Sequence, residues 1–131
     1  YMNHPLFGAA WDVGHAHMDD VDHETEIMIM GKNLRAIHVH DNDGHGDTHS
    51  NLFSGTFNID EFITALIDAN YKGYFTFELN PIFKFGNGSG RHTFAKSGKL
   101  FDPTTEMFDA AEKFIYELGK ACLTEYNVFE E

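Results

Sequence analysis

Acidic and imidazole side chains gather in three short segments of the chain, and their types suit metal binding. Asp12 and His15 lie in WDVGHAH, His38 and His40 lie in IHVHDNDGHGDTH, and Glu78 ends YFTFE. Carboxylate oxygens and imidazole nitrogens are ligands for divalent cations such as Mn²⁺, Co²⁺, Mg²⁺ and Zn²⁺. We therefore expect metal-dependent chemistry if the fold brings the three segments together.

The elements that would position these side chains alternate between strand and helix. Apolar and β-branched runs predict strands over 6–12, 34–41 and 74–79. Amphipathic spacing and capping residues predict helices around 22–31, over 58–71 and over 103–118. Strands that alternate with helices are typical of βαβ units, so the sequence predicts an α/β fold with a parallel sheet.

Burial in this scheme follows the apolar residues. The strand over 6–12 is expected to be buried on both faces, and the apolar stripes at 59–67 and 107–118 are expected to face the core. The connection over 41–57 is too rich in glycine, asparagine and acids to be a core element, and its length is typical of functional loops. Asp19 and Asp20 are expected to begin the helix around 22–31.

Three of the metal-binding candidates occupy equivalent places in the predicted fold. Asp12, His38 and Glu78 each stand at the carboxyl end of a different strand. Because the carboxyl ends of parallel strands open on one side of the sheet, these side chains should converge there. An oxygen-rich set leans towards Mn²⁺ or Mg²⁺, and added histidines lean towards Zn²⁺.

Further polar side chains are expected just beyond the strand ends. His15, Asp47 and His49 lie on the predicted loops and could complete a second metal position or bind an anionic or hydroxylated substrate. His40 is placed on the same strand face as His38 and is the weaker candidate for a ligand.

Each of these residues has a structural alternative. Asp12 could be no more than the cap of the following helix, His38 could be a hydrogen-bonded structural histidine, and Glu78 could be an exposed residue at a strand end. Three such groups at three equivalent strand ends are difficult to explain by chance, so we favour the metal-binding interpretation. Three other histidines, His4, His23 and His92, have no such placement and are expected at the surface.

The composition limits the classes of protein that fit. The chain has 131 residues, 42% of them hydrophobic, which suits one domain core. Its formal net charge of −12 disfavours binding to nucleic acid. A single cysteine, Cys122, cannot form a disulfide framework, so we expect a reducing, cytoplasmic setting. No apolar run approaches the roughly 20 residues of a membrane span.

The segments WDVGHAH, IHVHDNDGHGDTH and GYFTFEL, with the helix from 58 to 71, together resemble the C-terminal three βα units of the xylose isomerase-like TIM-barrel superfamily. This superfamily contains sugar and sugar-phosphate isomerases and epimerases, and class II apurinic/apyrimidinic endonucleases. The resemblance covers about residues 6–80. It implies that residues 1–131 form one partial domain with strands six to eight of a (β/α)8 barrel, and that the first five βα units are absent.

The resemblance also implies roles at individual positions. Asp12 matches the metal-binding acid that ends strand six, and His38 matches the ligand that ends strand seven in an H-x-x-D turn completed by Asp41. Glu78 matches the acid of strand eight, which binds the metal and acts as a catalytic base in the isomerase branch. Another glutamate, at the end of strand five, would lie in the absent part.

The second set of residues does not distinguish the branches of the superfamily. His15 matches a second metal ligand or a substrate contact. Asp47 and His49 match a D-x-H pair that holds an additional zinc in the endonuclease branch, and a similar pair occurs in isomerase-like members.

The function implied by the resemblance is metal-dependent isomerisation or epimerisation of a sugar or sugar phosphate, with proton transfer next to a ketose carbonyl. The alternatives are a zinc phosphodiesterase of the apurinic/apyrimidinic endonuclease type and a non-catalytic metal-binding or assembly fragment. Without the earlier strands the chain is expected to be inactive alone. Its open strand edge should pair with the missing N-terminal half of the barrel or with a second copy.

Overall fold

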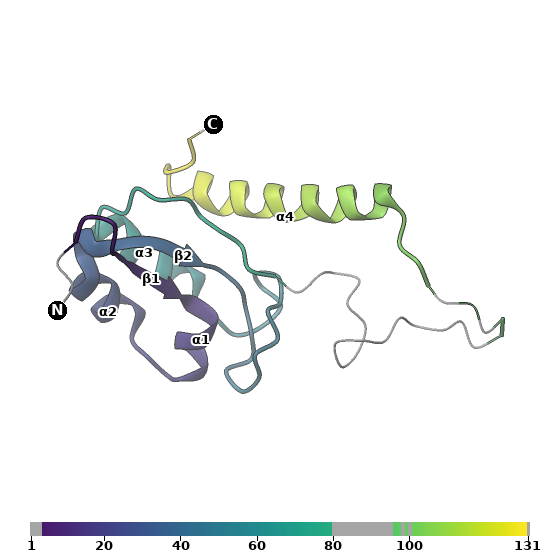
Figure 1. Cartoon of the computed structure of the whole chain (residues 1–131), viewed down its shortest axis with the longest axis horizontal. Helices are drawn as coiled ribbons and strands as arrows, with labels where there is room; N and C mark the ends of the chain where they lie inside the picture. Colours follow the sequence, from purple (N-terminus) through teal and green to yellow (C-terminus); the bar gives the residue numbers. More distant parts are fainter. Residues whose placement is uncertain (1–3, 80–95, 98, 100, 131) are drawn as a thin grey trace.

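Two parallel strands, β1 (Ala9–Asp12) and β2 (Leu34–His38), form the sheet of this computed structural model (Figure 1). The structure describes residues 4–79, 96–97, 99 and 101–130. The strands are connected by helices α1 (Val13–Met18) and α2 (His23–Met30) and by the short 3-10 helix η1 (Gly31–Asn33). Two further helices follow, α3 (Ile59–Asp68) and α4 (Thr105–Glu125). The chain is therefore a mixed α/β structure with parallel strands.

The register of the sheet places Asp12 and His38 beside each other. The two residues are Cα partners at the carboxyl ends of β1 and β2. Since the carboxyl ends of parallel strands open on one side of a sheet, both side chains leave the sheet at the same edge.

The third predicted strand, over 74–79, is reduced to one parallel bridge between Val39 and Phe77. The Val39 N–H donates to the Thr76 carbonyl (2.8 Å), and the Glu78 N–H donates to the Val39 carbonyl (3.0 Å). The prediction of a full strand is wrong for the described residues, because the segment pairs only with Val39, the residue that follows β2. The bridge still holds Glu78 beside the end of β2.

The first strand is shorter and more exposed than the sequence predicts. It begins at Ala9 rather than at residue 6, and Leu6 is 88% exposed. Ala10 is also exposed, so the expectation of burial on both faces is wrong. Within the described residues β1 pairs with β2 alone, so its other edge has no strand partner there.

A short helix that the sequence does not predict, α1, follows β1 directly. Asp12 caps it, because the Asp12 carboxylate accepts the N–H of His15 (3.0 Å). Asp19 is the C-cap of α1 and Asp20 turns the chain with a φ of 53°, so the expectation that these two acids begin the next helix is wrong. Asp22 is the N-cap of α2, which lies within its predicted range.

The last two helices form as predicted but have different ends. α3 begins at the predicted capping box, in which the Asn58 side chain accepts the N–H of Glu61 (3.3 Å). It ends at Asp68 rather than at residue 71, because Asn70 turns the chain with a φ of 52°. α4 begins two residues later than predicted, with Thr104 as its N-cap, and continues to residue 125.

The core lies between β2, α2 and α3. Its largest fully buried apolar side chains are Phe62, Ile27, Ile37, Ile63, Val13 and Val39. In the stripe predicted at 59–67, the residues Phe62, Ile63 and Leu66 are buried, Ile59 is partly buried and Ile67 is exposed, while Ala65 is also buried.

α4 contacts this core through its C-terminal half, while its N-terminal half extends past the body of the molecule (Figure 1). Leu118 and Cys122 pack against the core. Gly119 lies so close to Phe77 that an added Cβ would be 2.7 Å from its ring. The stripe predicted at 107–118 therefore faces the core at its end only, and Phe114 is exposed. Among the described residues, none of the helices combines the length and hydropathy that a membrane span needs.

Candidate metal centre

Asp12, His38 and Glu78, here called the first group, meet where the parallel strands end. Their ligand atoms all lie within 4.8 Å of one another. Nδ1 of His38 is 2.6 Å from Oε2 of Glu78 and 3.7 Å from Oδ2 of Asp12. The His38 and Glu78 side chains are 47% and 45% exposed, so a solute can reach them. Two carboxylates and one imidazole at this spacing form a donor set that suits a divalent cation.

Asp12 also caps the following helix, which was the structural alternative for this residue. Its Oδ1 accepts the His15 N–H at the start of α1, while its Oδ2 faces His38. A carboxylate has two oxygens, so capping a helix does not prevent the same side chain from offering a ligand atom.

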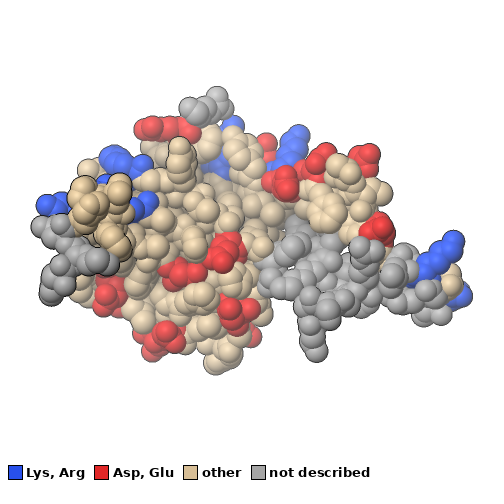
Figure 2. Space-filling view, viewed as in Figure 1, with Lys and Arg blue, Asp and Glu red and all other residues tan. Residues whose placement is uncertain are grey.

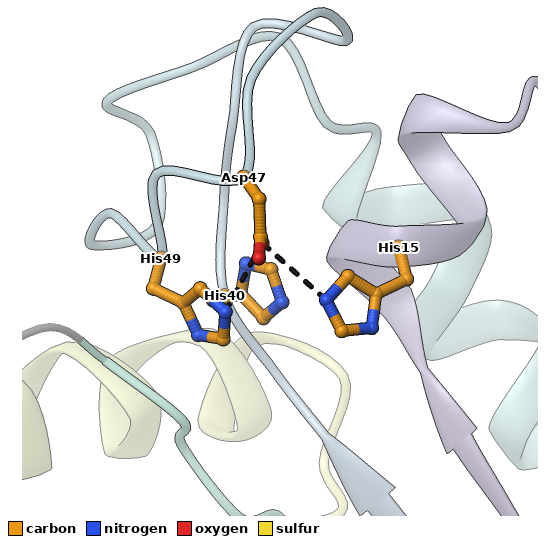
Figure 3. Close-up of side chains that lie close together, drawn as sticks. All are labelled: His15, His40, Asp47 and His49. Carbon is orange, nitrogen blue, oxygen red and sulfur yellow. Dashed lines mark ion pairs between the residues drawn. The ribbon is translucent and has the colours of Figure 1, made fainter.

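Figure 3 shows a second group of residues, His15, His40, Asp47 and His49. It lies next to the first group, because His15 and His40 both contact Asp12. The ligand atoms of this second group are also within 4.8 Å of one another. Oδ1 of Asp47 is 3.0 Å from Nε2 of His49 and 3.4 Å from Nε2 of His15. His15 lies in α1, not on a loop as the sequence suggested. Three imidazoles and one carboxylate form a donor set typical of zinc.

The hydrogen bonds of His49 favour a positive charge in the second group. Its Nδ1 is 2.8 Å from the Glu78 carbonyl oxygen, which can only accept, so Nδ1 carries the proton of this bond. A neutral His49 would then present the lone pair of Nε2 to the Asp47 carboxylate, 3.0 Å away. Two acceptors at this distance need a proton or a cation between them, so the donors present fit a bound metal.

Asp12 connects the two groups. Its Oδ1 is 3.0 Å from Nε2 of the buried His40, and its Oδ2 is 3.3 Å from Nδ1 of His15. Partial burial raises the pKa of the Asp12 carboxyl, but the hydrogen bond from the His15 N–H and the neighbouring charges of His40 and His15 outweigh it. The net pKa lies below its ordinary value, so Asp12 is a carboxylate at neutral pH.

Residues 41–57 hold the second group in place, and the expectation that this segment stays out of the core is wrong. Asp41 and Asn42 are buried, and so is Phe57. The Asp41 carboxylate accepts the N–H groups of Asn42 (2.8 Å), Gly55 (2.9 Å) and Phe57 (3.1 Å). These bonds replace the water that a buried carboxylate loses, which is why so polar a segment can be packed.

The expectation that His23 lies at the surface is also wrong. The residue is 5% exposed, and the Trp11 indole N–H donates to its Nδ1 (3.1 Å). Burial, with the nearby charge of His17, lowers the pKa of His23 to about 4. His4 is exposed, as expected, and His92 lies outside the described residues.

The sequence of this chain matches a known family. Residues 1–113 match the family described as xylose isomerase-like TIM barrel, and the chain belongs to this family. The resemblance predicted from the sequence is therefore confirmed.

Individual relatives match shorter stretches. The chain is 40% identical over 54 residues to the fructoselysine 3-epimerase of Escherichia coli O157:H7 and to that of Shigella flexneri, over 41% of this chain and 20% of each relative. It is 27% identical over 77 residues to an uncharacterised protein of Methanocaldococcus jannaschii, over 57% of this chain and 26% of that protein. The matched part thus spans about a quarter or less of these relatives.

Proposed function

We propose that the protein is a metal-dependent isomerase or epimerase of a sugar or sugar phosphate, and that this chain supplies strands six to eight of its barrel. The observation that carries the proposal is the convergence of Asp12, His38 and Glu78 at the ends of neighbouring parallel segments. Membership of the family and the similarity to fructoselysine 3-epimerase support the reaction class.

The first group would hold the cation, with Mn²⁺, Co²⁺, Mg²⁺ or Zn²⁺ as candidates. Asp12 and Glu78 supply oxygen donors, and His38 supplies a nitrogen donor. Nδ1 of His38 lies 2.6 Å from Oε2 of Glu78, so a bound cation would occupy the place between these two atoms that a proton could otherwise take. A bound divalent cation would polarise the carbonyl and the adjacent hydroxyl of a ketose.

Glu78 is our candidate for the catalytic residue that removes the proton next to the carbonyl. Its carboxylate is half exposed, and among the described residues it pairs with His38. A second carboxylate would return the proton, on the other face of the same carbon in an epimerase or on the neighbouring carbon in an isomerase. We expect that carboxylate on strand five, outside this chain.

The second group would bind either a second cation or an oxygen of the substrate. His15 is the residue best placed for a substrate contact, because its side chain is half exposed and lies between Asp12 and Asp47. Asp47 and His49 would hold it in position.

The earlier strands of the barrel, or a second copy of the chain, would cover the open side of the sheet. Leu6 and Phe7 precede β1 and are exposed, and Ala10 within β1 is exposed as well. Apolar side chains along an unpaired strand edge are typical of a surface that another strand covers. On this proposal the chain is inactive alone.

The alternative function is a zinc phosphodiesterase of the apurinic/apyrimidinic endonuclease type. The imidazoles of His15 and His49 in the second group favour it, because zinc prefers nitrogen-rich sites. The net charge of −12 disfavours it. On the face drawn in Figure 2, Lys and Arg lie towards the edges and do not form one patch that could follow a phosphate backbone.

The test uses the full-length protein loaded with Mn²⁺ or Co²⁺ and a panel of ketoses and ketose phosphates in D₂O. We expect deuterium to enter the carbon next to the carbonyl, and Glu78→Gln to slow this exchange by at least about 100-fold. Glu112→Gln, an exposed glutamate of α4, is the matched control and should not change the rate. Absence of exchange across the panel would refute the proposal, and cleavage of a duplex with an abasic site would support the alternative.

A further inference from the structure

His40 is a fully buried polar residue whose two ring nitrogens have different surroundings. Its Nε2 lies 3.0 Å from Oδ1 of Asp12. Its Nδ1 has no hydrogen-bond partner among the described residues. Since an ionised carboxylate can only accept, Nε2 must carry the proton of this bond. His40 is therefore a donor to Asp12.

The His40 ring is held on two sides. One face stacks on the ring of His49, with centroids 3.9 Å apart and an angle of 9° between the planes. The edge that carries both nitrogens faces Gly14, where an added Cβ would lie 1.9 Å from Cε1 and 2.2 Å from Nδ1. Glycine is thus required at position 14, because the first turn of α1 packs directly against the imidazole.

A second contact fixes Gly14 itself. The Asn42 side chain donates from Nδ2 to the Gly14 carbonyl (2.8 Å), and Asn42 is buried. The loop that follows β2 therefore holds the start of α1 against His40, which in turn reaches Asp12.

This packing makes His40 a poor metal ligand. Its Nδ1 is covered by Gly14, and its Nε2 is occupied by Asp12. The ring would have to leave its stack on His49 before either nitrogen could reach a cation.

We propose that His40 is a positioning residue, held by Gly14, that orients the Asp12 carboxylate for metal binding. Oδ1 of Asp12 takes the N–H groups of His40 and His15, so Oδ2 is left facing His38 at 3.7 Å. The inference rests on the proposed role of Asp12 as a ligand. Hydrogen-bond partners of ligating side chains typically change metal affinity by about 10- to 100-fold when they are removed.

The test is a Co²⁺ titration of the full-length protein, with affinity measured by competition against a chelating dye and coordination followed by the visible absorption of bound Co²⁺. His40→Leu removes the donor, His40→Gln keeps an N–H at a similar reach, and Gly14→Ala keeps the imidazole but displaces its ring. His17→Gln, at a histidine that lies outside both groups, is the control.

We expect His40→Leu and Gly14→Ala to weaken Co²⁺ binding by about 10- to 100-fold with altered absorption, and His40→Gln to remain within about threefold of the unsubstituted protein. The number of Co²⁺ ions bound per chain should not change. Circular dichroism of the metal-free variants establishes that they are folded, and if His40→Leu does not fold, the contrast between Gly14→Ala and His40→Gln decides.

Two results would overturn the inference. Unchanged affinity in folded His40→Leu and Gly14→Ala would show that His40 does not orient a ligand. Loss of one bound Co²⁺ in both His40 variants would make His40 a ligand itself. Glu78→Gln separates the two proposals: if this variant binds Co²⁺ like the unsubstituted protein, or if the latter binds none, the proposed metal site and the role of His40 both fail.

Discussion

His23 should make the folded state sensitive to acid. The residue is buried beside Trp11, whose indole N–H donates to its Nδ1, so a proton on that nitrogen would break the bond. The proton of the neutral ring is on Nε2, which has no hydrogen-bond partner among the described residues, and the ring packs edge-on against Phe57 and Phe62. The folded state therefore favours the neutral form of the His23 imidazole, and burial is the main cause of its lowered pKa.

The sign and size of the effect follow from the pKa of His23 in the folded and in the unfolded chain. The pKa of His23 is about 4 in the folded chain, against 6.5 for an unperturbed histidine. As the pH falls below 6.5 the unfolded chain takes up the proton first, so stability is fully present above this pH and declines towards pH 4. A difference of about 2.5 pH units corresponds to at most about 3 kcal/mol of unfolding free energy.

The assay is urea denaturation of the full-length protein between pH 7.5 and 4, compared with His23→Asn. Asparagine keeps an acceptor for the Trp11 N–H but does not titrate, so this variant should lose about 2 to 3 kcal/mol less stability over the range. His4→Gln, at an exposed histidine, should follow the unsubstituted protein. If His23→Asn and the unsubstituted protein lose stability in parallel, or if the His23 ring titrates near 6.5 by NMR, the reasoning is wrong.

Two further predictions concern the elements that carry the site. Asp41→Ala leaves three N–H groups without their acceptor and should lower the unfolding free energy by about 2 to 4 kcal/mol. Asp43→Ala, at an exposed turn, should lower it by less than about 1 kcal/mol. Equal losses of the two variants in urea denaturation would contradict this prediction. Asn58→Ala removes the cap of α3 and should lower the unfolding free energy by about 1 kcal/mol, while Asn58→Asp keeps a cap and should keep the stability of the unsubstituted protein. If both variants lose stability in urea denaturation, the effect is not due to capping.

The parts of the fold that could be predicted from the sequence carry their signals locally. α3 has both a capping box at Asn58 and apolar residues at helical spacing, and α2 has its cap at Asp22. β2 is marked by β-branched residues and alternation. In each case the local preference for helix or strand agrees with the face that the tertiary structure buries, so the local prediction holds in the folded chain.

The parts that could not be predicted depend on contacts between distant residues. α1 is six residues long and has no apolar repeat, and it is held by Asp12 at its start and by Asn42, 28 residues away from Gly14. The burial of Asp41 depends on N–H groups up to 16 residues further along the chain. A polar residue type alone predicts exposure, so the sequence wrongly predicts that His23 lies at the surface and that the segment over 41–57 stays out of the core.

The site shows the same division. Spacing along the strands predicts that Asp12, His38 and Glu78 should share one edge, and the register brings them there. Spacing cannot predict which imidazole meets which carboxylate oxygen, because that depends on side-chain rotamers fixed by packing. His40 contacts Asp12 because Gly14 leaves room for its ring, and a glycine in a turn-like sequence gives no sign of this role.

Asp12 has several structural tasks at once, and this decides which residue can test the chemistry. One of its oxygens caps α1 and accepts from His40, and the other faces His38 and His15. A substitution of Asp12 would therefore disturb the helix, the buried histidine and both groups together, and a loss of activity could not be assigned to a lost ligand. Within the part of the chain that the structure describes, the Glu78 side chain caps no helix and pairs with the half-exposed His38. The bonds that hold this residue in place are made by its backbone N–H and carbonyl. Removing its charge changes the first group while leaving those bonds intact, so Glu78 is the residue at which metal binding and proton transfer can be tested apart from folding.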